Sequence, residues 1–407
     1  MNLISDMLSD IRIPKMAKVR QSFYTFRLEG YAEELQKQLL LNAKSTQLSG
    51  KRIAVAVGSR KIYGIGELVR ILIDFLKSEG ALPFIVPAMG HHGGACAEGQ
   101  LEILSGLGIT PESMGVSIAA GIDVIKTGPC HDGSQAAFSM AAAEADGIVL
   151  INRVKPHPNF SGEHESGLLN MLATGLGNLQ GASDMHNRPL AGFSERILKI
   201  SETLLEKMPV LFGVAVLENA VNEIAELHIV PKVHMATQDA ALLRRAKAMI
   251  PRVLFDGVDV MIIDRIGKDI CGNGFDPNVT GKPQYIVMLD MTEESEGAAQ
   301  GIGEGAVITR RLFEKIDLQK TYLNIIVTNH PYYAKIPMIM DNERLAVQAA
   351  IKMLLEADRE NLRIVRIQDT LNVEDIWISE AMLDEAERNE NIEVLRYPGE
   401  MEFSAEF

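Results

Sequence analysis

Residues 51–87 contain a short apolar run, a glycine-containing loop, an amphipathic stretch and a second apolar run, and this order restricts the fold more than any other feature. The run at 51–57 is rich in β-branched residues, 67–77 has apolar residues at helical spacing, and 83–87 reads as another strand. Strands and helices are recognised by these periods. The pattern predicts a β-loop-α-β unit with parallel strands, in which ligands bind beside the loops at the carboxyl edge of the sheet.

Further apolar runs predict more strands and helices along the chain. Residues 147–151 predict a buried strand that leads into a loop rich in Pro, His and Gly, and 210–217 with 224–230 predict a hairpin. Later strands are expected at 258–264, 285–289, 322–328 and 362–367, with a helix at 342–357. Because 407 residues exceed what one core usually serves, we expect two α/β domains, 1–207 and 208–407, with an active-site cleft between them.

The charge balance and the cysteines limit the partners and the compartment. The net charge is −14 and no Lys/Arg-rich run is present, which argues against nucleic acid as a partner. The three cysteines form no C-x-x-C pair and are odd in number, so a reducing compartment is expected. No stretch resembles a signal peptide or a membrane span, which predicts a cytoplasmic protein without a membrane partner. The oligomeric state stays open, a homo-oligomer included.

Two histidine-bearing loops are candidates for chemistry. His91 and His92 follow the strand predicted at 83–87 and are flanked by glycines, so one of them is a candidate general base, the alternative being a pair of surface histidines that cap the next helix. Residues 152–160 follow the strand predicted at 147–151 and contain two cations and His157 between prolines, an arrangement that suits an anionic ligand.

Three further segments carry polar groups beside glycines. Ser166 and Gly167 precede an apolar run, where free backbone N–H groups bind phosphate or simply cap a helix. His186 lies in a polar stretch where a metal or phosphate contact and plain exposure are both open. The loop at 264–278 combines three glycines, Lys268 and acids beyond what a turn needs, although its spacing is not that of an EF-hand and a structural turn network is the alternative.

Taken in order, the Gly-Ser-Arg loop ending at Arg60, the loop with His92, the segment 153–160 and the loop with Lys268 resemble the nickel-pincer lactate racemase family over most of the chain. In that family an active site between two α/β domains holds a nickel-pincer nucleotide, and the reaction inverts the carbinol carbon of a 2-hydroxy acid. The resemblance therefore implies an isomerase with a small hydroxy acid as its substrate.

The resemblance also implies roles for individual residues. By position, Arg60 corresponds to the arginine that grips the substrate, His92 and His157 to the acid/base histidines, His186 to the nickel ligand, and Lys268 to a lysine on the substrate side. Two imidazoles near their ordinary pKa of about 6.5 suit exchange of the hydroxyl proton. A planar guanidinium suits a carboxylate, and neutral imidazole is a normal nickel ligand.

The sequence departs from the family at the residue that tethers the cofactor. Asn170 stands where the family carries a lysine that is covalently linked to the pincer, and an amide cannot make that bond. Ser166, Gly167, Asn170 and His186 are therefore expected to hold the nucleotide without a covalent link. The aspartate expected near Arg60 is also absent, with Val57 in its place.

The leading interpretation is thus a hydroxy-acid racemase or 2-epimerase that works by hydride transfer to a nickel-pincer nucleotide. One alternative is a metal-assisted lyase or isomerase of sugar acids without the pincer. Another is a non-catalytic carboxylate-binding protein, which would need cations but no pair of proton carriers.

Overall fold

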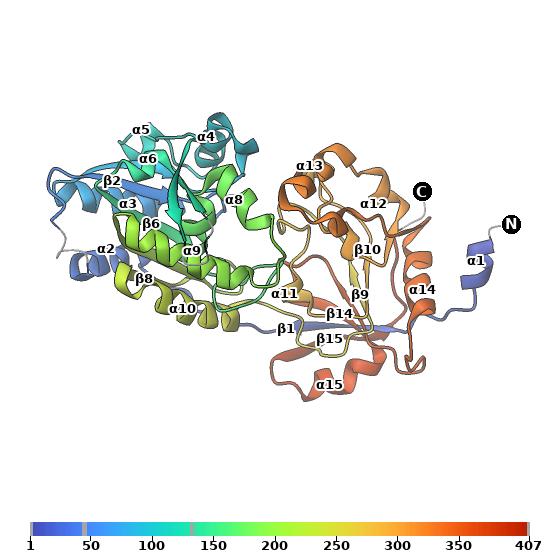
Figure 1. Cartoon of the computed structure of the whole chain (residues 1–407). Helices are drawn as coiled ribbons and strands as arrows, with labels where there is room; N and C mark the ends of the chain where they lie inside the picture. The colour runs from blue at the N-terminus through green and yellow to red at the C-terminus, as the bar shows by residue number, and fades with distance from the viewer. Residues whose placement is uncertain (1–2, 43–46, 131–132, 134, 405–407) are drawn as a thin grey trace. The chain divides into compact units, whose positions relative to one another are not determined.

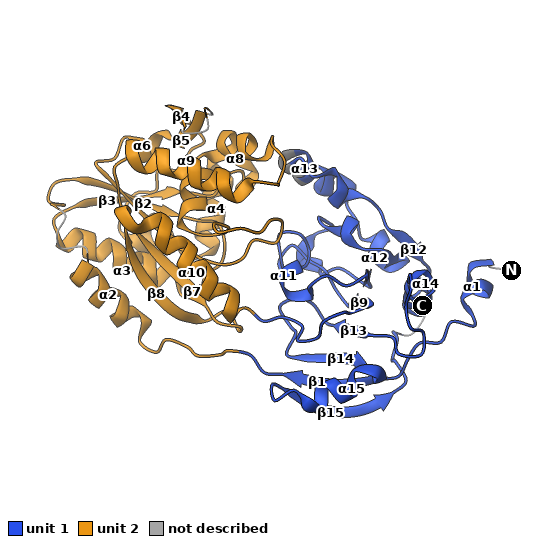
Figure 2. Ribbon diagram, turned by 60° about the horizontal axis from the view of Figure 1, so that its bottom comes forward, with its two compact units in different colours: residues 1–23, 251–407 blue, residues 24–250 orange. Residues whose placement is uncertain are grey.

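The computed structural model describes residues 3–42, 47–130, 133 and 135–404, and the chain divides into two compact α/β units (Figures 1 and 2). Unit 2 is continuous and spans residues 24–250, whereas unit 1 combines residues 1–23 with 251–407. Figure 2 draws unit 1 in blue and unit 2 in orange. Over the described part of the chain, no helix has the length and apolar character that crossing a bilayer requires.

Unit 2 is built on a five-stranded sheet in the order β3-β2-β6-β7-β8. The first four strands in this order run parallel, and β8 pairs antiparallel with β7. The strands are β2 (Arg52–Val57), β3 (Leu82–Pro87), β6 (Gly147–Arg153), β7 (Val210–Glu218) and β8 (Ile224–Pro231). A separate hairpin pairs β4 (Val124–Pro129) with β5 (Gln135–Ser139).

Helices cover both faces of this sheet because its strands are apolar on both sides. Alternate residues of β2 point to opposite faces: Ala54 belongs to a core with α8, α9 and α10, whereas Val55 belongs to a core with α2, α3 and α4. The helices of unit 2 are α2 (Tyr31–Asn42), α3 (Ile65–Ser78), α4 (Ala97–Gly106), α5 (Pro111–Met114), α6 (Met140–Ala143), α7 (Leu168–Asn170), the π-helical turn η2 (Met171–Gly175), α8 (Asn178–His186), α9 (Phe193–Lys207) and α10 (Met235–Met249).

Unit 1 contains an eight-stranded mixed sheet in the order β12-β11-β10-β9-β13-β14-β1-β15. The N-terminal strand β1 lies between β14 and β15 and pairs antiparallel with both. The strands are β1 (Met16–Gln21), β9 (Val260–Ile263), β10 (Tyr285–Met288), β11 (Val307–Thr309), β12 (Met338–Met340), β13 (Ile364–Ile367), β14 (Asp375–Ser379) and β15 (Ile392–Gly399). The helices are α1 (Leu3–Leu8), α11 (Pro277–Thr280), α12 (Arg310–Glu314), α13 (Leu318–Thr328), α14 (Glu343–Met353) and α15 (Leu383–Arg388).

The division into units differs from the one expected at 207/208. Strand β7 pairs with β6 along its length, so β7 and β8 complete the sheet of unit 2 instead of opening another domain. Unit 1 takes up the chain again at residue 251 and also contains residues 1–23. Pairing between strands far apart in the sequence is what a linear reading misses.

The strand expected at 322–328 is wrong, because these residues form most of α13. A short apolar run does not distinguish strand from helix by itself. The residues at the two ends of the run favour the helix. The side chain of Asp317 accepts a hydrogen bond from Lys320 N and caps the N-terminus. Asn329 ends the helix in the left-handed region at φ 55°. The other expected strands, at 51–57, 83–87, 147–151, 210–217, 224–230, 258–264, 285–289 and 362–367, are confirmed within one to two residues at each end.

Candidate functional site

The sheet of unit 2 has a topological switch point between β2 and β6. From β2 the chain crosses to β3 on one side, whereas β6 is followed by β7 on the other side. In open α/β sheets, ligands bind beside the carboxyl ends of the strands at such a point. Ser59 and Arg60 follow β2 directly, and His157 lies four residues beyond β6. The topology therefore brings these loops to the place where a ligand is expected.

The loop after β3 places His92 beside the loop after β2. His92 Nδ1 and Ser59 Oγ are 2.5 Å apart and share a hydrogen bond. The ring of His91 lies edge-on to that of His92, with centroids 5.0 Å apart, and its centroid is 6.5 Å from that of His186 at the end of α8. Ser59 and three histidines, from two loops and a helix end, thus form one chain of contacts.

His157 joins this cluster through aromatic rings. Its ring stacks on Phe160 with centroids 4.2 Å apart. Phe160 packs against Phe193 at 4.5 Å, and Phe193 against His186 at 5.3 Å. Phe193 is buried and anchors this row to the core of unit 2. The structure therefore brings together His92, His157 and His186, which come from three separate parts of the sequence.

The surroundings of His157 disfavour its protonation. Burial, together with the smaller effects of the nearby charges of His186, Arg60 and Lys155, lowers its pKa from 6.5 to about 3. Arg60 and Lys155 are thus close enough to act on His157 electrostatically. A neutral imidazole beside two cations is an environment that attracts an anion, which the net charge of −14 would otherwise repel.

A buried carboxylate fixes the loop that carries His157. Glu165 accepts hydrogen bonds from the backbone N–H groups of His157, at 2.7 Å, and Gly162, at 2.9 Å. Its side chain is fully buried and forms an ion pair with Lys247 Nζ at 2.5 Å. Three donors to one carboxylate close the segment between His157 and Glu165 into a defined loop.

A second buried carboxylate supports the loop that carries Arg60. Glu218, at the end of β7, accepts a hydrogen bond from Tyr63 N at 2.9 Å and pairs with Arg153 at the end of β6. Glu218 is 8% exposed. The loop after β2 is therefore attached to the two neighbouring strands on the far side of the switch point.

The amides at Ser166 and Leu168 have partners within the chain. Ser166 N donates to Lys155 O at 3.2 Å, and Leu168 N donates to Asp239 Oδ1 at 2.8 Å. Asp239 also contacts His164 Nδ1 at 3.3 Å, and both side chains are buried. A Cβ on Gly167 would lie 2.4 Å from Asp239 Oδ1, so only glycine fits there. These two amides are therefore bonded within the chain, and Gly167, the N-cap residue of α7, makes no side-chain cap.

Two buried acceptors follow on the next turn. Asn170 Oδ1 and Thr174 Oγ1 are shielded from solvent, and neither has a hydrogen-bond partner among the described residues. Buried polar atoms are nearly always hydrogen-bonded. A bound group or water that supplies donors is therefore expected at this turn.

Lys268 belongs to unit 1, in the loop that follows β9. Its backbone N–H donates to Ser295 Oγ at 2.8 Å, and its side chain is exposed. The pKa of Glu296 is lowered chiefly by its hydrogen bond with Lys320 and to a smaller degree by the charge of Lys268. The role of Lys268 toward a substrate stays a prediction.

Several residues of this site were not singled out from the sequence: Ser59, Phe160, Phe193, Glu165, Glu218 and Asp239. In the sequence alone, Phe160 and Phe193 cannot be distinguished from other core residues, nor the three carboxylates from other surface residues. Only the position of Ser59, directly after a predicted strand, offered a signal.

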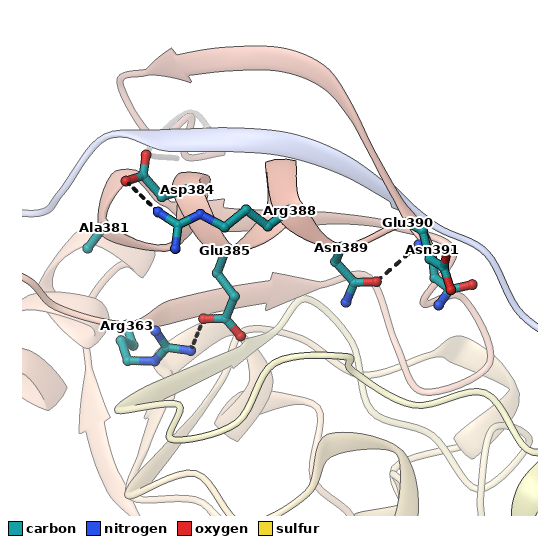
Figure 3. Close-up of a pocket in the computed structure, with 8 residues that line it drawn as sticks. All are labelled: Arg363, Ala381, Asp384, Glu385, Arg388, Asn389, Glu390 and Asn391. Carbon is teal, nitrogen blue, oxygen red and sulfur yellow. Dashed lines mark hydrogen bonds and ion pairs between the residues drawn. The ribbon is translucent and has the colours of Figure 1, made fainter.

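A surface hollow in unit 1 contains none of the predicted site residues (Figure 3). It has a volume of about 780 Å³ and lies over α15 and the turn after it. Its charged side chains neutralise one another: Arg363 pairs with Glu385 at 2.7 Å, and Arg388 with Asp384 at 3.5 Å (Figure 3). Apart from Ala381 its lining residues are polar or charged, whereas ligand sites are lined mainly by apolar and aromatic side chains.

The chain was compared with solved structures, protein families and curated proteins. The chain is similar to the lactate racemase apoprotein from Thermoanaerobacterium thermosaccharolyticum, with 14% sequence identity and a TM-score of 0.48, over 87% of this chain and 84% of that one. No protein-family model matches the sequence. No curated protein matches it either.

Proposed function

We propose that this protein is an isomerase that inverts the carbinol carbon of a 2-hydroxy acid, as a racemase or a 2-epimerase. The observation that carries the proposal is the gathering of Arg60, His92, His157 and His186 at one edge of the unit 2 sheet. Cations for a carboxylate and imidazoles for a hydroxyl are the groups that such a substrate needs.

The substrate carboxylate is assigned to Arg60 and Lys155. Both charges act electrostatically on His157, so both lie near its ring. A guanidinium binds a carboxylate through two parallel hydrogen bonds, which fixes the direction of the adjoining carbon. Binding in this way would place the carbinol hydroxyl within reach of the histidines.

The nickel-pincer nucleotide fits what this site offers. Among the described residues, no three His, Cys, Asp or Glu side chains converge as a metal site, so the protein would supply His186 as a single ligand and the pincer the others. Asn170 Oδ1 and Thr174 Oγ1 are buried acceptors that need donors, which the hydroxyl groups of a nucleotide possess. The residues would hold the group by coordination and hydrogen bonds, without a covalent link at Asn170.

The division of labour follows from these positions. When bound, the pincer supplies an acceptor for the hydride of the carbinol carbon. Arg60 and Lys155 hold the carboxylate, and an imidazole takes up the hydroxyl proton and returns it. Phe160 and Phe193 line the histidine cluster with apolar surface, which strengthens the electrostatic contacts by excluding water.

Mass spectrometry and metal analysis test the cofactor. The protein is produced together with the pincer-making enzymes and measured under native and denaturing conditions. We expect nickel and a nucleotide adduct under native conditions, loss of the adduct on denaturation, and loss of nickel in His186→Ala. Protein that binds neither nickel nor nucleotide under these conditions would contradict this part of the proposal.

A carboxylate-binding protein is the second candidate, and the lowered pKa of His157 favours it. A nitrogen that takes up a proton only near pH 3 is a weak base at neutral pH. Saturable binding of hydroxy acids by cofactor-loaded protein, with their chirality unchanged, would select this function.

We propose a cytoplasmic location for either function, because no disulfide joins Cys96, Cys130 and Cys271.

A further inference from the structure

Residues 167–175, here called the α7–η2 turn, carry the two buried acceptors of the site, and the first amide of the turn is capped from a distant helix. The first N–H groups of a helix have no partner inside it. Gly167, the N-cap residue of α7, has no side chain that could accept such a bond. The acceptor is Asp239 on α10, whose Oδ1 lies 2.8 Å from Leu168 N and 71 positions away in the sequence.

The carboxylate of Asp239 is held in one orientation. Its second oxygen, Oδ2, contacts His164 Nδ1 at 3.3 Å, and the backbone N–H of His164 donates to Ser194 Oγ on α9 at 2.9 Å. A Cβ on Gly167 would stand 2.4 Å from Asp239 Oδ1, so the carboxylate occupies the place of the side chain that caps an ordinary helix. The position of the turn is therefore coupled to α9 and α10 instead of to its own preceding residue.

Two more hydrogen bonds hold the backbone just before Asn170. Asn152, near the end of β6, donates through Nδ2 to Gly167 O at 2.8 Å. The buried hydroxyl of Ser201 on α9 donates to Leu169 O at 2.9 Å. The start of the turn is thus bonded to β6, α9 and α10, and the side chain of Asn170 projects from a fixed stretch of backbone.

Stability alone does not explain the burial of Asp239. Its side chain is 1% exposed, and carboxylates are almost never fully buried unless they are paired. Removing such a group from water costs free energy that its contacts offset only in part, and well-packed apolar residues in the same place are often as stable or more stable. In some proteins buried ionic groups serve instead to specify one arrangement.

We infer that Asp239 is a positioning residue for the cofactor, which fixes Asn170 Oδ1 and Thr174 Oγ1 through the amide of Leu168. This rests on the proposed function and deepens it. A turn that is already held in place needs no ordering when a nucleotide binds, whereas a turn released from Asp239 would have to be ordered at the expense of affinity. Asp239 acts through the backbone of the turn and is assigned no contact with the cofactor.

Hydrogen exchange measured by mass spectrometry tests the clamp in cofactor-free protein. Asp239→Ala removes the acceptor of Leu168 N, and Asp239→Asn keeps an oxygen there without the charge. We expect residues 167–171 to exchange at least about 10-fold faster in Asp239→Ala and about 3-fold faster in Asp239→Asn, because a neutral acceptor forms the weaker bond. Unchanged exchange of residues 167–171 in both variants would overturn the inference.

Leu72→Ala is the control for lost stability. Leu72 is fully buried in α3, in the core on the other face of the sheet, where truncation to alanine destabilises the fold. This variant should exchange faster in α3 and leave residues 167–171 unchanged.

Nickel release tests the role of Asp239 toward the cofactor. Each variant is produced with the pincer-making enzymes, its nickel and nucleotide contents are measured, and the loss of nickel to a chelator is followed. We expect nickel loss to be at least about 10-fold faster than in the wild type for Asp239→Ala and about 3-fold faster for Asp239→Asn. Leu72→Ala should lose nickel at the wild-type rate. Asp239→Asn carries the test if Asp239→Ala does not fold, since it keeps an acceptor for Leu168 N.

Nickel loss at the wild-type rate from Asp239→Asn and from folded Asp239→Ala would overturn the inference. Equally accelerated loss from Leu72→Ala would overturn it too, because release would then follow stability instead of position. Failure of the proposed function gives a different result. In that case the wild type holds neither nickel nor nucleotide while exchange of residues 167–171 still depends on Asp239, so that only the role toward the cofactor falls.

Discussion

His157 is the residue at which the loop, the cations and the aromatic row meet. Its backbone is held by Glu165, its ring by Phe160 and the amide of Asn159, and its charge state by burial and by Arg60 and Lys155. The N–H donated to its Nδ1, its burial and the neighbouring cations all disfavour the imidazolium. Protonation of this one side chain should therefore cost folding free energy that can be measured.

The sign of the pH effect follows from linkage. The folded pKa of His157 is about 3 and the unfolded value is 6.5, so between these values the unfolded chain binds the extra proton. Stability is therefore lost as the pH falls through this window, by at most about 1.4 kcal/mol per pH unit. We expect the free energy of unfolding of cofactor-free protein to fall more steeply from pH 6.5 to pH 4.5 for the wild type than for His157→Gln.

Urea denaturation at several pH values measures this difference. His234→Gln removes an exposed histidine and serves as the control, with a slope like that of the wild type. Parallel slopes for the wild type and His157→Gln would show that His157 does not stay neutral in the folded protein.

At the scale of elements, the loop between β6 and α7 depends on Glu165. This carboxylate has no exposed surface and accepts from two backbone amides and Lys247. Glu165→Gln should lower the free energy of unfolding by roughly 1–3 kcal/mol, because the amide group turns donors toward donors. Glu163→Gln, on an exposed side chain in the same loop, should have no comparable effect. Thermal and urea denaturation of both variants check the expectation, and equal stabilities would contradict it.

The contact between η2 and the loop after β3 requires a glycine. A Cβ on Gly175 would lie 2.7 Å from Ala88 O, and Gly175 O accepts a hydrogen bond from Gly90 N at 3.0 Å. Gly175→Ala should destabilise the protein by about 1–3 kcal/mol and displace the loop that carries His92. Gly106→Ala, at the end of α4 where a Cβ meets open space, is the matched control. A Gly175→Ala variant as stable as Gly106→Ala would show that the two segments do not touch.

Elements with strong local patterns were predictable from the sequence, and elements defined by distant pairing were not. The run at 51–57, followed by a helical stretch, carries its own period and becomes β2 and α3. The run at 322–328 is equally apolar but becomes part of α13, because its end caps outweigh its composition. The place of strand β1 in its sheet could not be predicted, since its partners β14 and β15 lie more than 350 residues away.

At the scale of the whole molecule, unit 1 is completed by the N-terminal segment. Strand β1 fills the position between β14 and β15, and it pairs with both. Removal of residues 1–23 would leave β15 without a neighbour and open the sheet edge of β14. We expect residues 24–250 to fold alone with a cooperative transition, whereas residues 251–407 should fold only when residues 1–23 are supplied in trans.

Circular dichroism and thermal denaturation of these fragments test that organisation. A cooperative transition of 251–407 without the N-terminal segment would contradict it. So would a failure of 24–250 to fold, since all five strands of its sheet lie within that range.

The candidate site was predictable in part for the same physical reason. Residues directly after parallel strands, such as Arg60 and His92, can be placed at one sheet edge from the order of elements alone. The carboxylates that hold the loops, Glu165 and Glu218, cannot, because their role depends on burial and on partners in other loops. The hydrogen bond from Asn159 to His157 is likewise visible only in three dimensions.

Inversion of a hydroxy acid in deuterated water tests the central claim most directly. Cofactor-loaded protein is incubated with single enantiomers of a panel of 2-hydroxy acids, and the products are separated by chirality and weighed by mass spectrometry. Hydride transfer predicts that one acid is inverted while its carbinol hydrogen is retained, and that Arg60→Ala abolishes most of the activity. Inversion with deuterium at the carbinol carbon, or no inversion of any acid by protein that contains the cofactor, would contradict the account.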